Sequence, residues 1–199
     1  MKIGPKYKIA RRLGAGIFEK TQGAKYQARA ERKKTKFSRQ KTGFGAQLLE
    51  KQKARFVYGI TDKQFKNYVK ASLKKGTAQN EGLYQMLEQR LDNVVYRSGF
   101  ADTRRQARQF VSHGHIKVNG KKVNIPSFNV EKGDIVSIRK ESAAKTAFIN
   151  VEEKIKNAAK SNWITVDLKS KEASVYALPH YDPIQELFDL SSVFEFYRR

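Results

Sequence analysis

Two groups of cations lie close enough in the sequence to hold phosphate groups together. One falls within a single turn of a helix-like segment, and the other lies in the stretch HIKVNGKKV at 115–123. Guanidinium and ammonium groups bind phosphate oxygens through charge-assisted hydrogen bonds. A helix that needs only solubility usually alternates the signs of its charges, so this pattern favours a polyanionic ligand. The groups are Arg104, Arg105 and Arg108, and Lys117, Lys121 and Lys122.

Local signals predict the helix that presents the arginines. Thr103 and Gln106 form a capping box at its start, and Ala107, Phe110 and Val111 recur at the spacing of a core-facing stripe. The arginines then lie on the opposite side of the helix. We expect alanine at any one of the three arginine positions to leave stability almost unchanged, as at other surface positions.

A short hairpin and a third strand are predicted after this helix. Asn119-Gly120 is the dipeptide that best tolerates the positive φ angles of a two-residue turn, and it joins strands at 116–118 and 121–123. The segment 133–139 supplies a third strand. We expect the turn to present the hairpin lysines together on one surface beside the arginine helix.

Earlier segments show the 3.6-residue period of helices. An apolar stripe predicts one continuous helix that stops near Gly99, with Arg90 and Arg97 projecting together from it. Before it, the segment AQLLEKQKARFVYG ends at Gly59, and a capping box at Thr61 and Gln64 opens a second helix. We expect these two helices to form an antiparallel pair whose outer faces are basic. The stripe is Leu83, Leu87, Leu91, Val94 and Val95, and the basic faces carry Lys51, Lys53, Arg55, Lys63, Lys66, Lys70, Lys74 and Lys75.

The net charge of +22 is unevenly placed along the 199 residues. Residues 1–80 hold 22 basic and 4 acidic side chains, whereas residues 140–199 hold 9 of each. The segment 28–45 has no apolar period, so we expect it to be extended until nucleic acid neutralises it. A merely solubilising tail is the alternative, but Phe37 and Phe44 interleave with the charge, and bases stack on such rings.

Several classes of protein are excluded or disfavoured. The chain has no cysteine, which excludes disulfides and thiolate metal sites, and it has no apolar run of about 18 residues that would suggest a membrane span. The basic N-terminus contains Gly and Pro and lacks a secretory apolar core, so we expect no targeting peptide. His113 and His115 are at best half a metal site, and we expect a loop role, with no metal and no cofactor.

At this point a resemblance is evident. The segment from LEQRLDNVVYR to GDIVSIR, with its cores RLDNVVYR and ARQFVSHGHIKVNG, closely resembles the RNA-binding domain named after protein four of the small ribosomal subunit. GPKYKIARR at 4–12 and EKQKARFVYGITDKQFKNY at 50–68 are similar to other parts of that ribosomal protein family. Many relatives carry a zinc-binding cysteine cluster near the N-terminus, and this chain has none. We therefore expect its N-terminal lobe to order on RNA instead of on metal.

The resemblance implies a structural, non-enzymatic constituent of the small ribosomal subunit. Its main partner would be small-subunit ribosomal RNA, which it would clamp at a helix junction in the 5′ domain during assembly. Neighbouring ribosomal proteins, and mRNA where it enters the ribosome, would be further partners. Roles in translational accuracy and, in some members, operon repression are also implied. The protein would be located in the cytoplasm, in a ribosome, and an organellar ribosome is the alternative. The candidate rRNA-binding residues are Lys33, Lys34, Lys36, Arg39, Lys51, Lys53, Arg55, Lys66, Arg90, Arg97, Arg104, Arg105, Arg108, His113, His115, Lys117, Asn119, Lys121 and Lys122.

Two rival readings stay open. A stand-alone RNA-binding protein with the same module would lack the long lysine-rich N-terminus. Arg90-Leu91-Asp92 resembles a short motif of pseudouridine synthases, but the roughly 60 residues after the module are too few for their catalytic domain.

The predicted fold is α+β, with a mainly helical lobe and a helix-helix-hairpin lobe that carries a small antiparallel sheet. The predicted ranges are a basic extended arm at 1–45, a helical lobe at 46–83 completed by 178–199, and an RNA-binding lobe at 84–177. In the last range, alternation predicts a strand around Ile164 to Leu168 and a partner strand around Ala173 to Ala177 that pairs with it. In 178–199, Ser192 and Glu195 predict a short terminal helix that returns to the first lobe. We expect Phe194 and Phe196 to anchor that helix in the core.

Overall fold

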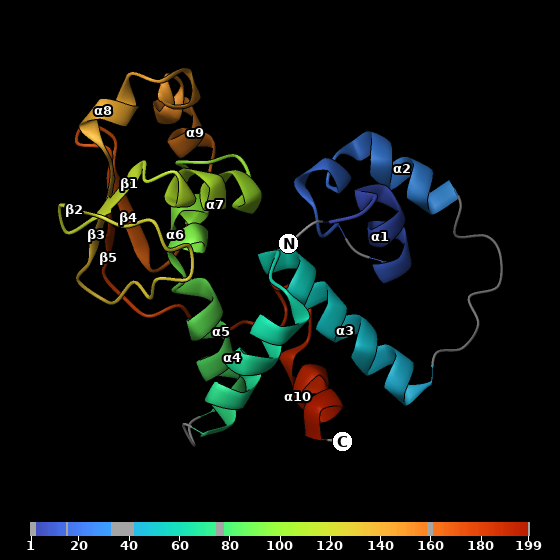
Figure 1. Ribbon diagram of the computed structural model, residues 1–199. Helices are drawn as coiled ribbons and strands as arrows, with labels where there is room; N and C mark the ends of the chain where they lie inside the picture. The colour runs from blue at the N-terminus through green and yellow to red at the C-terminus, as the bar shows by residue number, and fades with distance from the viewer. Residues whose placement is uncertain (1–2, 15, 33–41, 75–77, 159–160, 199) are drawn as a thin grey trace. The chain divides into compact units, whose positions relative to one another are not determined.

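The computed structural model describes the chain except for residues 1–2, 15, 33–41, 75–77, 159–160 and 199 (Figure 1). It divides into two compact units. The first unit comprises residues 1–80 with 181–199, and the second comprises residues 81–180. Helices dominate the first unit and a five-stranded antiparallel sheet lies in the second, so the α+β prediction is confirmed. The domain ranges expected from the sequence stay a prediction.

Helices make up the regular structure described in the first unit. They are α1 (Lys6–Leu13), the 3₁₀ turn η1 (Glu19–Thr21), α2 (Ala24–Arg32), α3 (Gly43–Tyr58), α4 (Asp62–Lys74), the start of α5 (Gln79–Glu88) and α10 (Leu190–Arg198). Within the described part of the chain, no helix is both long and apolar enough to cross a lipid bilayer.

The N-terminal segment is folded where we expected an extended arm. Helices α1 and α2 occupy part of the range 1–45 (Figure 1). A small apolar core packs against them. Leu13, Ile17 and Phe18 are buried in this core, where the Phe18 ring lies 6.2 Å from the ring of Phe56 on α3. The expectation of order through RNA alone is therefore wrong for this segment, because its few apolar residues already pack on α3.

The predicted end of α3 at Gly59 and start of α4 at Thr61 are confirmed, but α3 begins earlier than predicted, at Gly43, and the two helices do not form the expected antiparallel pair. Gly59 ends α3 with φ of 61°, and the Thr61 hydroxyl and Gln64 side chain exchange hydrogen bonds with each other's backbone amides at 3.3 and 3.2 Å. Helix α3 instead packs along α10, where the Phe44 and Phe196 rings lie 5.5 Å apart. The apolar face of α3 is thus covered by the end of the chain.

The C-terminal helix starts differently from its prediction. Asp189 caps α10, because its carboxylate accepts hydrogen bonds from the backbone amides of Ser191 and Ser192 at 2.9 and 3.0 Å. Glu195 accepts instead from the Gln47 side chain of α3 at 2.8 Å. Phe194 is buried, as expected for a core anchor.

The second unit packs helices on one face of its sheet (Figure 1). The strand order is β2-β1-β3-β5-β4, and all neighbouring strands are antiparallel. The predicted pairing of the last two strands is confirmed. After α5 the elements are α6 (Leu91–Arg97), α7 (Arg104–Ser112), β1 (Ile116–Val118), β2 (Lys121–Lys122), β3 (Ile135–Ile138), α8 (Lys140–Ala143), η2 (Thr146–Phe148), α9 (Val151–Asn157), β4 (Ile164–Asp167) and β5 (Glu172–Val175).

The predicted continuous helix before Gly99 is broken into α5 and α6. Arg90 is extended, with ψ of 135°, and forms a bridge with Asn129. The amide of Leu91 donates to the Phe128 carbonyl at 2.9 Å, and the amide of Val130 donates to the Gln89 carbonyl at 2.8 Å. Backbone groups that would have bonded along one helix are therefore satisfied by the loop before β3. The break turns Arg90 into the protein.

Register separates the two faces of the sheet. Ile116, Val118 and Val136 face α6 and α7 and join the core of the second unit. Lys117 is opposite Lys122 on β2 and opposite Ser137 on β3, so these three side chains lie on the outer face. Alternation along the strands therefore sends lysines outward at one edge of the sheet.

Two glycines with similar backbone angles provide a stability test. Gly99 has φ of 77°, and a Cβ there would lie 2.8 Å from the Ile155 Cα and 2.9 Å from the Ala158 Cβ. Gly120 has φ of 76° and open space around it. We expect Gly120→Ala to reduce the unfolding free energy by roughly 1–2 kcal/mol from backbone strain. Gly99→Ala should cost about 2–5 kcal/mol, since overpacking adds to the strain.

Urea unfolding of the two variants measures this difference. Equal losses would mean that α9 moves aside from Gly99 without cost.

Candidate nucleic-acid interface

A buried carboxylate holds two arginines of the candidate interface. Glu88, at the end of α5, is fully buried. Its oxygens accept hydrogen bonds from Arg97 Nε and Nη2 at 2.9 and 3.0 Å and from the Asn93 amide at 3.0 Å. Arg104 Nη2 lies 3.9 Å from Glu88 Oε1, and Arg104 Nε donates to the Asn93 side-chain carbonyl at 2.7 Å. This carboxylate therefore fixes guanidinium groups from α6 and α7 at once.

Asp92 holds a second pair of arginines. Arg90 donates to both carboxylate oxygens, through Nε at 3.1 Å and Nη2 at 2.8 Å. Arg108 donates to Oδ2 of the same carboxylate through Nε at 2.8 Å. Asp92 is 2% exposed and Arg90 is 3% exposed, so this arrangement is an internal one. One negative charge compensates two positive charges from different elements.

These contacts change the predicted arginine face. Arg90 is buried and ion-paired, so it does not project with Arg97, and it is withdrawn from the interface. The side chains of Arg97, Arg104 and Arg108 stay partly exposed at the surface of α6 and α7. Arg104 and Arg108 are each tied to a buried carboxylate, so we now expect alanine at either position to lower stability, unlike at an ordinary surface position. Arg105 is exposed, as predicted, and within the described residues has no ion-pair partner.

The hairpin turn has the predicted geometry. Asn119 and Gly120 have φ of 49° and 76°, the pair of positive angles that a type I′ turn requires. The side chain of Asn119 is engaged within the protein, since it donates to Asp134 at 2.7 Å and accepts from the Ile135 amide at 2.9 Å. Asn119 therefore fastens the turn to the start of β3 and does not present its amide outward.

The structure does not place all three hairpin lysines on one surface. Lys117 and Lys122 are opposite each other and share the outer face, whereas Lys121 is opposite Val118 and shares its face. Lys122 also reaches the turn after α7, because its side chain fills the place where a Cβ on Gly114 would stand. Of the three lysines, Lys122 is thus the one with a contact beside the C-terminal end of the arginine helix.

Further cations gather around the connection between α7 and β1, near Lys122. Arg139 Nε donates to Glu141 at 2.9 Å, and its Nη1 lies 3.4 Å from the Gly114 carbonyl. The rings of His113 and His115 lie 6.0 Å apart. His115 Nδ1 lies 2.9 Å from the Ser142 hydroxyl, and its ring contacts the rings of Phe110 and Phe148.

The surroundings of His115 favour its neutral form. Partial burial lowers the pKa of His115 below its ordinary value of 6.5, and the charges of Lys145, His113 and Arg139 lower it further. Such a concentration of positive charge around one ring is the electrostatic environment that an anion would relieve. Among the described residues, no three His, Asp or Glu side chains gather closely enough to hold a metal ion.

Comparison with known proteins shows the family of this chain. A family model described as the ribosomal protein S4/S9 N-terminal domain matches residues 1–88, and one described as the S4 domain matches residues 89–136. The small ribosomal subunit protein uS4 of Amoebophilus asiaticus is 42% identical and aligns with 99% of this chain and 98% of its own length. The chain belongs to the uS4 family. The uS4 proteins of Chloroflexus aurantiacus and Chlorobium limicola are 39% and 40% identical, over 99% and 96% of this chain and 98% and 96% of their own lengths.

The candidate rRNA-binding residues of the first unit differ in how exposed their side chains are. Lys51 is 7% exposed, pairs with Asp62 at 2.8 Å and lies over the Phe196 ring at 4.7 Å, so it stabilises the packing of α3 on α10 and is withdrawn from the interface. Lys53 pairs with Glu50 at 2.6 Å.

Helix α4 presents the more open cations of this unit. Lys66 lies on its exposed face in one row with Lys63, Lys70 and Lys74. On α3, the Arg55 guanidinium lies 4.5 Å from the centroid of the Phe56 ring. Lys33, Lys34, Lys36 and Arg39 lie outside the described residues.

Sequence reasoning missed cations that the uS4 fold brings together. Arg139 and Lys145 join the His115 region from positions after β3, and only tertiary contact reveals this. In the first unit, Arg11, Lys20, Lys25 and Arg29 surround one cleft. The excess of basic residues in 1–80 indicated an anion-binding region, but it did not indicate which of these residues lie together in the fold.

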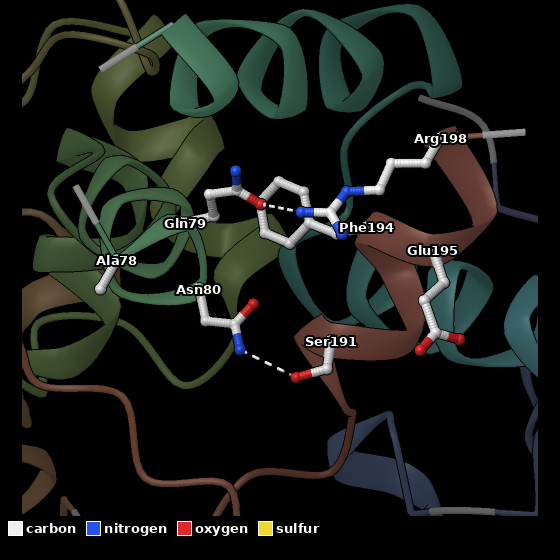
Figure 2. A pocket seen from close by; sticks show the side chains of 7 residues that line it. All are labelled: Ala78, Gln79, Asn80, Ser191, Phe194, Glu195 and Arg198. Carbon is white, nitrogen blue, oxygen red and sulfur yellow. Dashed lines mark hydrogen bonds between the residues drawn. The ribbon is translucent and has the colours of Figure 1, made fainter. Parts of the chain in front are cut away.

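A second cleft in the first unit has a different character. About 550 Å³ in volume, it lies between the start of α5 and α10 (Figure 2). Arg198 donates to Gln79 at 2.8 Å and Asn80 donates to Ser191 at 2.9 Å, beside the ring of Phe194 (Figure 2). Because its polar groups pair with one another, this cleft offers no concentration of charge for a polyanion.

Asp92 provides a test of the buried network. Asp92→Asn keeps the size of the side chain but leaves Arg90 and Arg108 without their counter-charge, and we expect a loss of roughly 3–5 kcal/mol in unfolding free energy. The control is Asp102→Asn, whose exposed carboxylate pairs with Lys154 at 2.8 Å and should cost at most about 1 kcal/mol. Chemical denaturation compares the two. Similar small losses would show that the arginines find other partners.

His115 provides a test by titration. Because its pKa is lowered in the folded state, the unfolded chain binds more protons as the pH falls through 6.5, and stability should decline there. The NMR signals of His115 should titrate below 6.5, and Lys145→Ala should raise the pKa of His115 toward that value. Added RNA should also raise it if phosphate binds nearby. A pKa at or above 6.5 in the free protein would contradict this electrostatic picture.

Proposed function

We propose that this chain is a structural, non-catalytic constituent of the small ribosomal subunit that binds ribosomal RNA through α7 and the β1–β2 hairpin. The observation that carries the proposal is the contact of Lys122 with the turn that follows α7. Lys122 lies against Gly114 in the turn after α7, Lys117 is the cross-strand neighbour of Lys122, and Arg105 is exposed on α7 itself. Together they offer one RNA backbone contacts from two rigid elements.

The buried carboxylates support this proposal by preorganising the surface. Arg97, Arg104 and Arg108 are held in place by Glu88 and Asp92 before any ligand arrives. Side chains that are already ordered lose less conformational entropy when they contact phosphate. A positively charged surface of this kind suits a folded RNA of fixed shape better than a flexible one.

The finer parts of the proposal follow from family membership. We propose a helix junction in the 5′ domain of small-subunit rRNA as the binding site, contacted by both units of the chain during assembly. Neighbouring ribosomal proteins, mRNA near its entrance, a contribution to translational accuracy and a cytoplasmic ribosome belong to the same proposal. Relatives named uS4 match nearly the whole chain, which favours it over a stand-alone RNA-binding module or a pseudouridine synthase.

Crosslinking separates these alternatives. Ultraviolet crosslinking of the full chain in cells, followed by sequencing of bound RNA, should give one dominant site in small-subunit rRNA. Scattered cellular RNAs would favour the stand-alone module, and a modified uridine at the site that depends on this chain would favour the enzyme.

The hairpin offers a matched pair of variants. Lys122→Ala and Lys121→Ala remove the same charge from adjacent positions on opposite faces of the hairpin. Filter binding to the rRNA junction fragment should show a loss of roughly 1–3 kcal/mol for Lys122→Ala, as for a charge-assisted contact, and little change for Lys121→Ala. The slope of log affinity against log salt should fall by roughly 0.7–0.9 for Lys122→Ala alone. Equal effects would mean that the hairpin acts as a diffuse charge.

A further inference from the structure

A cleft of about 520 Å³ lies between α1, η1 and α2 in the first unit. Its volume falls in the range of pockets that accept small ligands or single residues of a polymer. The apolar core beneath it, which includes Leu13 and Phe18, fixes α1 and α2 on α3. The side chains that could contact a ligand in this cleft are those of Tyr7, Arg11, Lys20, Lys25, Tyr26 and Arg29.

The charge of this cleft favours an anionic occupant. Four of its wall side chains are cations, all of them exposed. Within the described part of the chain, none of the four has a carboxylate at salt-bridge distance. Cations grouped without counter-charges repel one another, and a bound anion removes that repulsion.

The aromatic residues give the occupant a second property. Tyr7 is 51% exposed, although tyrosine rings usually bury most of their surface. Its ring lies 5.6 Å from that of Tyr26, whose hydroxyl donates to the Tyr7 carbonyl at 3.4 Å. A base inserted between the two rings would need about 7 Å, or two stacking steps of about 3.4 Å. The available stacking surface is therefore the outer face of Tyr7.

We propose that this cleft binds a single unpaired nucleotide of RNA. Its base stacks on Tyr7, and Arg11, Lys20, Lys25 and Arg29 contact the phosphates on either side. Base stacking on aromatic side chains tolerates any sequence, whereas a paired base inside a duplex has no free face to offer. The proposal rests on the proposed RNA-binding function and adds a site in the first unit that is separate from the α7 surface.

Variants of the full chain test the stacking contact. The probe is a fluorescein-labelled RNA hexanucleotide without secondary structure, with a duplex of the same length as comparison. Tyr7→Leu should weaken hexanucleotide binding about tenfold, in line with one lost stacking contact, whereas Tyr7→Phe should stay within about twofold. Tyr176→Leu is the control, since this tyrosine of the second unit is equally exposed, at 50%. Duplex binding should be unchanged by Tyr7→Leu.

Two neighbouring arginines test the phosphate contacts. Arg11 lines the cleft, and Arg12 is exposed on the same helix but does not line it. Arg11→Ala should weaken hexanucleotide binding several-fold more than Arg12→Ala, although both remove one charge. With 4-thiouridine in the hexanucleotide, photocrosslinks should map to the peptide that contains Tyr7. Circular dichroism melting confirms that each variant is folded.

The outcomes distinguish this inference from the proposed function. If Tyr7→Leu and Arg11→Ala bind like their controls while Lys122→Ala loses affinity for the rRNA junction, the cleft proposal fails and the proposed function stands. Equal losses for single-stranded and duplex RNA would also overturn it, because the cleft would then read phosphate alone. If the unaltered chain fails to bind the rRNA junction, the proposed function fails.

Discussion

Two buried carboxylates organise the second unit and its surface. Glu88 and Asp92 lie at either side of the break between α5 and α6, and each is bonded to arginines that come from more than one element. Removing a carboxylate from water is costly unless it is fully paired, so the arginines must stay in place for the fold to be stable. The same ion pairs that stabilise the helices therefore determine where the positive charge of α6 and α7 stands.

This dual role alters how a basic surface should be interpreted. An arginine on an amphipathic helix can be a solvated charge, a ligand contact or the partner of a buried acid, and its sequence position does not distinguish them. Arg105 is fully at the surface, Arg108 is partly exposed while bonded to Asp92, and Arg90 is internal. A loss of RNA affinity on mutating Arg108 would combine lost contacts with a weakened core.

Local signals predicted local structure well. Asn119-Gly120 specified the hairpin turn, and Thr61 with Gln64 specified a helix start, because these features depend on bonds between residues a few positions apart. The break at Arg90 was not predictable, since the loop at 126–130 supplies the hydrogen bonds that replace the helical ones. The covering of α3 by α10 and the pairing of Arg108 with Asp92 are likewise long-range. Charge counts located the basic half of the chain but could not say which cations share a cleft.

The contact between Lys122 and Gly114 has a thermodynamic consequence. A free lysine side chain carries roughly 2 kcal/mol of rotamer entropy, part of which is lost whenever the ammonium group is immobilised. The stem of Lys122 already lies against the backbone at Gly114, where no side chain stands in its way, whereas Lys66 extends from an exposed helix face. The stem of Lys122 therefore has less room to change rotamer than that of Lys66, although both side chains are exposed. Of two equal charges, the one on the hairpin can form the same contact with a smaller entropic penalty and a slower release.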